Sequence, residues 1–366
     1  MNRNKILRRI YFSLFYLLVC CASSKQIDIV QKNESLCNAF KDYFLIGAAI
    51  SPEADLLSLE RKLFISKHYN SVTAENQMKP KQIHPKDDVW NWKPADDVVS
   101  FARSNKMKVR GHTLVWQQNT PSWLIKQNGQ LASKEYMYAK MKKHITAVMQ
   151  RYKNVVYCWD VVNEAISDQP NEVFRSKDTL YTIAGEEYVE MAFRFAKEAD
   201  PGAQLYYNDY RFSNPIKRQK IYNLLKKLVD KKVPIDGVGI QSHYVPGEIT
   251  KEYLQETIDM FSKLGLKIQV TELDVSVYNY RDKNNPDTDV TDDRYTEERR
   301  KRQEETYAML FELYRKNKDK ITGVTFWGSS DMRKNFRSNR IGKMDYPFLF
   351  DENMQPKQAF FRVVNF

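Results

Sequence analysis

The chain has 366 residues, of which 28% are charged, 42% hydrophobic and 13% aromatic, and its formal net charge is +12 at pH 7. This composition argues against a disordered chain and supplies enough apolar residues for a sizeable core. The length fits two ordinary domains or one large α/β barrel, which needs about 250 residues or more.

The positive charge does not by itself identify a partner. Lysines and arginines are spread through the chain and countered by acids, as in the segment TEERRKRQEETY at 296–307. Such a segment is typical of a solvated helix face. No nucleic-acid-binding motif accompanies it, so we expect no nucleic-acid partner. A basic surface also suits an acidic polysaccharide, and composition leaves that interpretation open.

The N-terminus resembles an export signal. A basic flank precedes the apolar run IYFSLFYLLV at 10–19, which Cys20 and Cys21 follow. The run is too short to span a bilayer, which takes about 20 residues. Leu18 lies three residues before Cys21, as in bacterial lipoprotein signals, whose cysteine is acylated. Cys21 fits this pattern better than Cys20, because Val19 is bulky for the position before a cleavage site.

We therefore expect residues 1–21 to be a lipoprotein signal and 22–35 a short tether, followed by one catalytic domain at 36–366. A simple secretory signal or a retained membrane anchor are the alternatives. The expected location is the outer membrane, the cell surface or the periplasm, with membrane contact only through the N-terminal lipid.

Two cysteines, Cys37 and Cys158, remain in the mature chain. They do not make a disulfide framework, and no CxxC or Cys/His cluster indicates a metal site. Cys158 lies in an apolar run, which favours a buried free thiol. We expect neither a metal nor an organic cofactor.

Short apolar runs alternate with amphipathic segments along the mature chain. Eight runs have strand character: 44–50, 69–76, 107–116, 155–165, 203–210, 236–244, 267–275 and 321–331. Helical spacing of apolar residues marks the segments 186–200, 214–232 and 250–265. Strand–helix alternation indicates parallel strands with right-handed crossovers, and eight such units predict a (β/α)8 barrel. An open doubly wound sheet fits less well, since no Gly-rich phosphate loop occurs.

Polar or aromatic residues stand at the ends of seven of these runs. They are Glu75, Asn76, His112, Trp116, Asn163, Glu164, Asn208, Asp209, Gln241, His243, Glu272, Asp274 and Trp327. Barrel active sites form at the C-terminal ends of the strands, so these side chains are predicted to converge. Neighbours on a regular strand face opposite sides, so Asn163 and Glu164 share a site only if the strand ends or bulges there.

This set of residues favours cleavage of a glycosidic bond. No His-x-His pair suits metal hydrolysis, no G-x-S-x-G elbow occurs, and Lys79 follows its strand in a polar loop unlike a Schiff-base lysine. Glu164 and Glu272 lie at the ends of separate strands. Cleavage of a glycosidic bond uses one protonated carboxylic acid and one ionised carboxylate, and these two residues are the candidates. Trp116 and Trp327 are candidate stacking platforms for sugars.

The segments TAENQMKP, GHTLVW, WDVVNEA, LYYNDY, GIQSHY, VTELDV and TFWGSSD, in this order, resemble glycoside hydrolase family 10, the endo-β-1,4-xylanases. The resemblance runs from about Leu36 to Val364. It implies hydrolysis of xylan or xylo-oligosaccharides by a retaining double displacement. Glu164 would be the general acid/base and Glu272 the nucleophile.

The same resemblance implies roles for the surrounding residues. Asn163 would hydrogen-bond the sugar 2-hydroxyl, and His243 would contact the nucleophile, with Asp274 completing the hydrogen-bonded chain. The implied glycone-subsite residues are Glu75, Asn76, Lys79, His112 and Gln241, with Trp116 and Trp327 as aromatic walls and Asn208 as a further supporting residue.

Three departures from the family pattern stand near the site. Pro80 and Gln117 replace the usual Trp and His, and Phe336 is the only aromatic residue where many members carry a second Trp. We expect a weaker aromatic wall beside the cleaved bond, or tolerance of decorated xylan. A non-catalytic cell-surface glycan-binding barrel and a barrel β-glucanase are the alternative functions. We expect a monomer.

Overall fold

The computed structural model describes residues 35–280, 294–331 and 336–366. The predicted signal at 1–21 and nearly all of the predicted tether at 22–35 lie outside the described residues. The description that follows concerns the remaining chain.

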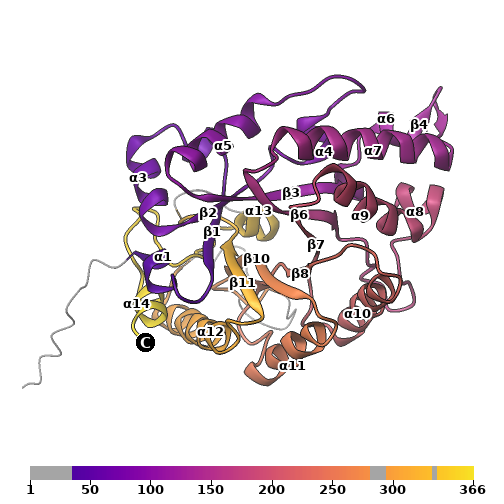
Figure 1. Ribbon diagram of the computed structural model, residues 1–366. Coiled ribbons are helices and arrows are strands. Elements are labelled where there is room, and N and C mark those ends of the chain that lie inside the picture. The colour runs from indigo at the N-terminus through magenta and orange to yellow at the C-terminus, as the bar shows by residue number, and fades with distance from the viewer. Residues whose placement is uncertain (1–34, 281–293, 332–335) are drawn as a thin grey trace, which may run out of the picture. The chain divides into compact units, whose positions relative to one another are not determined.

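Eight parallel strands form a closed barrel, in the order β11-β1-β2-β3-β6-β7-β8-β10, with β10 pairing back to β11 (Figure 1). Their bounds are β1 Leu45–Ile50, β2 Ser71–Ala74, β3 Lys108–Trp116, β6 Val156–Asn163, β7 Gln204–Asp209, β8 Gly237–Ile240, β10 Lys267–Val275 and β11 Ile321–Phe326. Each lies in one of the eight predicted runs, and the (β/α)8 prediction is confirmed.

The predicted run at 236–244 is divided in the structure. β8 ends at Ile240, and a two-residue strand, β9 (His243–Tyr244), pairs with β10 beyond it. Ser242, between them, has a φ of 65°, which a continuous strand does not allow. An additional hairpin of β4 (Lys126–Gln127) and β5 (Gln130–Leu131) lies outside the barrel sheet.

Helices surround the barrel (Figure 1). The long ones are α3 Leu59–His68, α5 Lys93–Ser104, α7 Lys134–Arg151, α9 Glu187–Ala199, α10 Pro215–Asp230, α11 Lys251–Ser262 and α12 Glu297–Lys316. The short ones are α1 Leu36–Ala39, α2 Pro52–Asp55, α4 Pro80–Ile83, α6 Ser122–Ile125, α8 Thr179–Ala184, α13 Phe336–Ile341 and α14 Gln358–Val364. The three predicted helices are confirmed as α9, α10 and α11.

The charged segment at 296–307 begins α12, where the Thr296 hydroxyl accepts a hydrogen bond from the Arg299 backbone N–H (3.3 Å). Most of its side chains face solvent, as predicted, but Arg299, Gln303 and Tyr307 are buried. Their spacing of four residues places them on one helix face. The charge pattern of the sequence therefore did not indicate that one face of this helix is buried.

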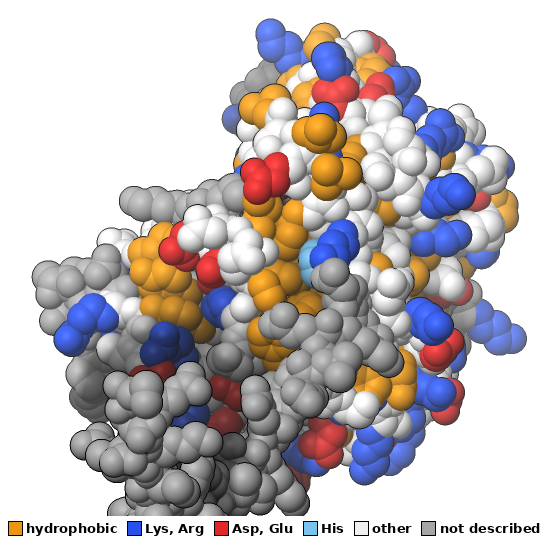
Figure 2. Space-filling view, turned by 90° about the vertical axis from the view of Figure 1, so that its left-hand side faces the viewer, with side chains coloured by type: hydrophobic (Ala, Val, Ile, Leu, Met, Phe, Trp, Pro, Cys, Tyr) orange, Lys and Arg blue, Asp and Glu red, His pale blue; other side chains and the backbone are white. Residues whose placement is uncertain are grey.

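Cationic side chains are dispersed over the surface. On the face shown in Figure 2, many of the Lys and Arg side chains lie toward the right-hand side, with mostly uncharged groups and a few acidic side chains between them. The most exposed large apolar side chains, Leu57, Leu59 and Leu63, come from α3 and the turn before it. None of the helices formed by the described residues is long and apolar enough to cross a membrane. Cys158 is a buried free thiol, as predicted, and so is Cys37.

The close packing of the barrel leaves no room for a Cβ atom at some of its glycines. A Cβ at Gly111 in β3 would lie 2.1 Å from the buried Trp159 ring, whereas a Cβ at Gly323 in β11 would meet nothing closer than 3.8 Å. We expect Gly111→Ala to lower the free energy of unfolding by about 3 kcal/mol through overpacking, measured by chemical denaturation. Gly323→Ala is the matched control and should change it little; equal losses would contradict this account.

Candidate active site

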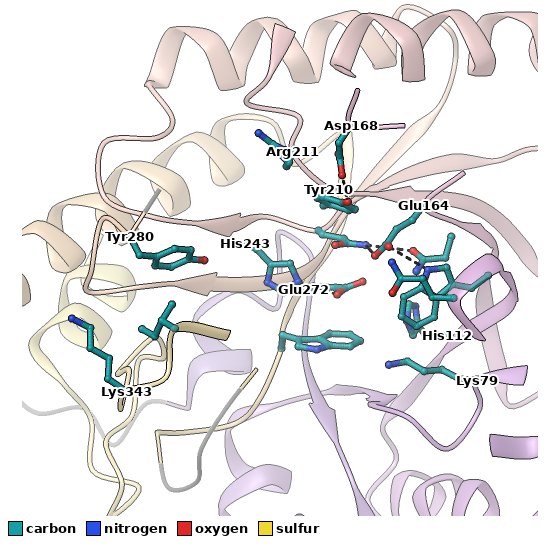
Figure 3. Close-up of a pocket in the computed structure, with 16 residues that line it drawn as sticks. Lys79, His112, Glu164, Asp168, Tyr210, Arg211, His243, Glu272, Tyr280 and Lys343 are labelled. Carbon is teal, nitrogen blue, oxygen red and sulfur yellow. Dashed lines mark hydrogen bonds and ion pairs between the residues drawn. The ribbon is translucent and has the colours of Figure 1, made fainter. Parts of the chain in front are cut away.

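A cavity of about 680 Å³ opens where the predicted strand-end residues converge (Figure 3). Eight of those residues line it: His112, Trp116, Asn163, Glu164, Gln241, His243, Glu272 and Trp327. Lys79, which was predicted from the family resemblance, lines it as well. Asn208 and Asp274 do not line it but hydrogen-bond to residues that do. Glu75 and Asn76 lie beside the end of β2 and outside the lining, where Asn76 contacts Lys79.

The backbone at the end of β6 explains how Asn163 and Glu164 face one cavity. β6 ends at Asn163, and Glu164 has a left-handed φ of 57°, as the predicted strand end requires. This conformation costs of order 1–3 kcal/mol for a residue other than glycine. Hydrogen bonds hold it: the Glu164 N–H donates to the Asn208 carbonyl (2.9 Å), and Arg175 Nε donates to the Glu164 carbonyl (3.0 Å).

Glu164 is placed to carry a proton. Its carboxyl group is buried, accepting from Gln241 Nε2 (2.9 Å) and Trp116 Nε1 (3.2 Å). Burial raises its pKa to about 7; the Gln241 hydrogen bond opposes this, and the negative charges of Asp209 and Glu272 add to it. The group is therefore protonated in much of the enzyme near neutral pH.

Glu272, in β10, has the opposite environment. Its Oε1 accepts from Asn208 Nδ2 (2.9 Å) and its Oε2 from His243 Nε2 (3.1 Å). Burial alone would raise the pKa of Glu272, but the His243 hydrogen bond and neighbouring positive charge outweigh burial, so the pKa is lowered. Glu272 is therefore the ionised partner.

His243 is held as a cation between two carboxylates. Its Nδ1 donates to Asp274 Oδ2 (2.8 Å), opposite the contact to Glu272. Burial disfavours the charged imidazole, but the charge and hydrogen bond of Asp274, followed by those of Glu272, raise the pKa of His243 to about 9. Both ring nitrogens therefore donate at neutral pH.

Three amide side chains connect the two glutamates. Asn163 Oδ1 accepts from Asn208 Nδ2 (2.9 Å) and from Gln241 Nε2 (3.4 Å). The Thr271 hydroxyl donates to Asn208 Oδ1 (2.7 Å), which fixes the orientation of the Asn208 amide. Within the described part of the chain, Asn163 Nδ2 has no acceptor, so it remains available to a ligand.

Lys79 lies among aromatic rings beside the glutamates. Its Nζ is 5.1 Å from the Trp116 ring centroid and 5.8 Å from that of Trp327, and it donates to Asn76 Oδ1 (2.8 Å). Burial lowers the pKa of Lys79, although nearby glutamates favour its charged form. These contacts produce a compact pocket of rings and one cation, suited to a sugar face and its hydroxyls.

His112 forms another wall of the cavity. Its ring centroid is 5.3 Å from that of Trp327, with the rings nearly perpendicular, and its Nδ1 lies 2.7 Å from Asp160 Oδ2. Asp160 in turn pairs with Arg110, which is fully buried in the barrel interior and donates to Gln269 (2.8 Å). The Asp160 carboxylate therefore fixes the orientation of the His112 ring.

Seven further residues line the cavity that the sequence did not single out: Gln118, Asp168, Tyr210, Arg211, Tyr280, Ile341 and Lys343. Tyr210 and Arg211 directly follow the strand-end pair Asn208 and Asp209, and that adjacency was the available signal. Tyr280, Ile341 and Lys343 come from loops and a helix end, which carry no such signal.

Two of the three residues that depart from the family pattern, Pro80 and Gln117, are not among the residues that line the cavity. Pro80 is buried at the first position of α4, and Gln117 begins a short 3₁₀ helix, Gln117–Asn119, of which only Gln118 lines the cavity. The side chain of Phe336 lies outside the described residues. The weaker aromatic wall therefore stays a prediction. In the part of the chain that the structure describes, no group of three or more His, Cys, Asp or Glu side chains could hold a metal ion.

Comparison with known proteins agrees with this geometry. The sequence profile of glycosyl hydrolase family 10 matches residues 35–366. A β-1,4-xylanase of Dictyoglomus thermophilum is 48% identical over 333 residues, 91% of this chain and 91% of the relative. Endo-1,4-β-xylanase B of Paenibacillus barcinonensis is 41% identical over 334 residues, 90% of this chain and 97% of the relative.

The fold agrees as well. A crystal structure of a xylanase from Paenibacillus barcinonensis, complexed with a conduramine derivative, has a TM-score of 0.85 at 40% identity and covers 91% of this chain and 99% of that one. A crystal structure of an endo-1,4-β-xylanase from Caldicellulosiruptor owensensis has a TM-score of 0.85 at 42% identity and covers 91% and 100%. The chain therefore belongs to glycosyl hydrolase family 10.

Proposed function

We propose that the chain is an endo-1,4-β-xylanase that cleaves internal bonds of xylan with retention of configuration. Glu164 is the acid/base and Glu272 the nucleophile. The observation that carries this assignment is the opposite environment of two buried carboxyl groups on one cavity: the pKa of Glu164 is raised to about 7, and that of Glu272 is lowered. Xylan as the substrate is supported by the names of the relatives.

The first step forms a covalent sugar–enzyme ester. The Glu272 carboxylate attacks the anomeric carbon while the bond from that carbon to the leaving oxygen breaks. Glu164 transfers its proton to the leaving oxygen. His243 keeps Glu272 ionised before the attack, and Asn163 Nδ2 is available to the 2-hydroxyl of the sugar.

The second step returns the enzyme to its starting state. Ester formation removes the negative charge of Glu272, which is one of the contributions that raise the pKa of Glu164. Glu164 then becomes a stronger acid and stays deprotonated, ready to accept a proton from water. The water oxygen bonds to the anomeric carbon, the ester bond breaks, and Glu272 is again a carboxylate.

A non-catalytic glycan-binding barrel explains these features less well. Binding alone gives no reason to hold His243 charged between Glu272 and Asp274 inside a buried site. A β-glucanase would share the chemistry and differ in the room for the C6 hydroxymethyl of glucose.

The acid role of Glu164 is tested by changing the leaving group. Glu164→Ala should lose about 10²–10⁴-fold in kcat/KM on xylo-oligosaccharides, because the leaving sugar needs a proton. It should lose much less on aryl xylobiosides with an acidic phenol. The matched variant, Glu272→Gln, should lose activity on both substrates, because no nucleophile remains. Equal losses for Glu164→Ala on both would exclude its role as the acid.

The pH dependence of kcat/KM follows from the two pKa values. Activity requires Glu272 ionised and Glu164 protonated, so the profile should be bell-shaped. Its acidic limb should lie below the usual glutamate value of 4.5, and its basic limb near 7. Gln241→Met removes a hydrogen bond that lowers the pKa of Glu164 and should move the basic limb to higher pH. A limb that stays in place would rule out Glu164 as its source.

We further propose that the enzyme is an exported lipoprotein. The support is the N-terminal sequence, with its basic flank, short apolar run and Leu18 three residues before Cys21. The lipid would anchor the barrel to a membrane facing the cell surface or the periplasm.

Metabolic labelling with radioactive palmitate tests the anchor. Cys21→Ser should abolish labelling and release the enzyme from the membrane fraction, because the acylated thiol is gone. Cys20→Ser should leave both unchanged. Labelling that survives in Cys21→Ser but not in Cys20→Ser would assign the lipid to Cys20, and unlabelled wild-type enzyme would refute the proposal.

A further inference from the structure

Arg211 is a cation at the active-site cavity that the hydrolysis mechanism does not use. It follows β7, two residues after Asp209, and its φ of 58° turns the chain sharply beside Tyr210. Arg211 lines the same cavity as Glu164 and Glu272. In Figure 3 it lies beside Tyr210, and Lys79 lies on the other side of Glu272.

The neighbouring cations Lys217 and Arg175 form ion pairs with aspartates of the protein. Lys217 Nζ lies 2.9 Å from Asp168 Oδ1 and 2.9 Å from Asp209 Oδ1. Arg175 lies 3.6 Å from Asp168 Oδ2 and donates to the Tyr210 hydroxyl (2.8 Å). The carboxylates of Asp168 and Asp209 therefore already have cationic partners other than Arg211.

Arg211 itself is exposed, and no carboxylate among the residues 35–280, 294–331 and 336–366 lies within ion-pair distance of it. The fold does not need an arginine here, because a left-handed backbone is better suited to glycine or asparagine. An exposed guanidinium at the edge of a cleft is instead suited to a ligand.

The cavity lining holds another cation, Lys343, on the side of Tyr280. Lys343 lines the cavity, with its Nζ 3.9 Å from the Tyr278 ring centroid, and Figure 3 places it near Tyr280 and away from Lys79. Lys343 is 6% exposed, so it offers little surface to a ligand, unlike the exposed Arg211.

We propose that Arg211 binds the carboxylate of a uronic acid substituent carried by the xylan chain in the cleft. The proposal rests on the proposed function, which supplies the polysaccharide. A guanidinium forms two parallel hydrogen bonds to a carboxylate, and charge-assisted bonds are about twice as strong as neutral ones. Neutral sugar hydroxyls offer no such pairing, so Arg211 selects for acidic decoration.

The test compares one polymer in two forms: glucuronoxylan, and the same glucuronoxylan after its carboxyl groups are reduced to hydroxymethyl groups. The readout is the ratio of kcat/KM on the acidic form to that on the reduced form. For the wild type we expect a ratio above one that falls toward one in 0.5 M NaCl. Arg211→Gln should lower the ratio about tenfold at low salt.

Two further variants separate the geometry of Arg211 from its charge. Arg103→Gln removes the same charge from an exposed position on α5, away from the cavity, and should leave the ratio at the wild-type value. Arg211→Lys keeps the charge without the planar fork and should give an intermediate ratio.

The possible results are distinct. An unchanged ratio in Arg211→Gln, or an equal fall in Arg103→Gln, would overturn the proposal while leaving the xylanase assignment intact. A wild-type enzyme that hydrolyses neither form would instead overturn the proposed function, and the uronic acid site with it.

Discussion

The negative charge of Glu272 is the feature on which the rest of the site depends. A buried carboxylate costs several kcal/mol unless hydrogen bonds and an opposite charge compensate for it. Here Asn208 and a protonated His243 supply that compensation, and Asp274 keeps the imidazole charged. The same charge raises the pKa of Glu164, so the acid is kept protonated partly by the nucleophile it works with.

The amides between the two glutamates make this coupling rigid. Asn163, Asn208 and Gln241 follow or end three neighbouring strands, and each uses its amide to hold the next. Because Thr271 fixes the orientation of Asn208, the direction of every donor in the series is determined. A retaining mechanism needs both carboxyl groups at constant positions through two steps, and a barrel provides them because its strands cannot move independently.

The sequence predicted the parts of the site that follow from strand periodicity. The eight runs and their polar ends located eight cavity residues, because a parallel barrel brings every strand end to one mouth. It did not predict the division of the 236–244 run at Ser242, which is a local backbone choice. Nor did it locate Tyr280 or Lys343, whose approach to the cavity depends on how loops pack. The family resemblance predicted His243 and Asp274 beside Glu272. The hydrogen bonds of Gln241 and Trp116 to Glu164, and of Asn208 to Glu272, became visible only in three dimensions.

The contrast between the net charge and Arg211 shows what composition leaves out. A formal charge of +12 is a sum over many side chains, and some of those on the described surface are paired with acids. Inside the cleft the number of charges matters less than which of them already has a partner. Lys79 is close to the negative charges of Glu272, Glu75 and Glu164, and Lys217 is paired with two aspartates, so the charge of each is already balanced within the protein. Arg211 differs from both in this respect, and the difference makes one end of the cleft chemically unlike the other.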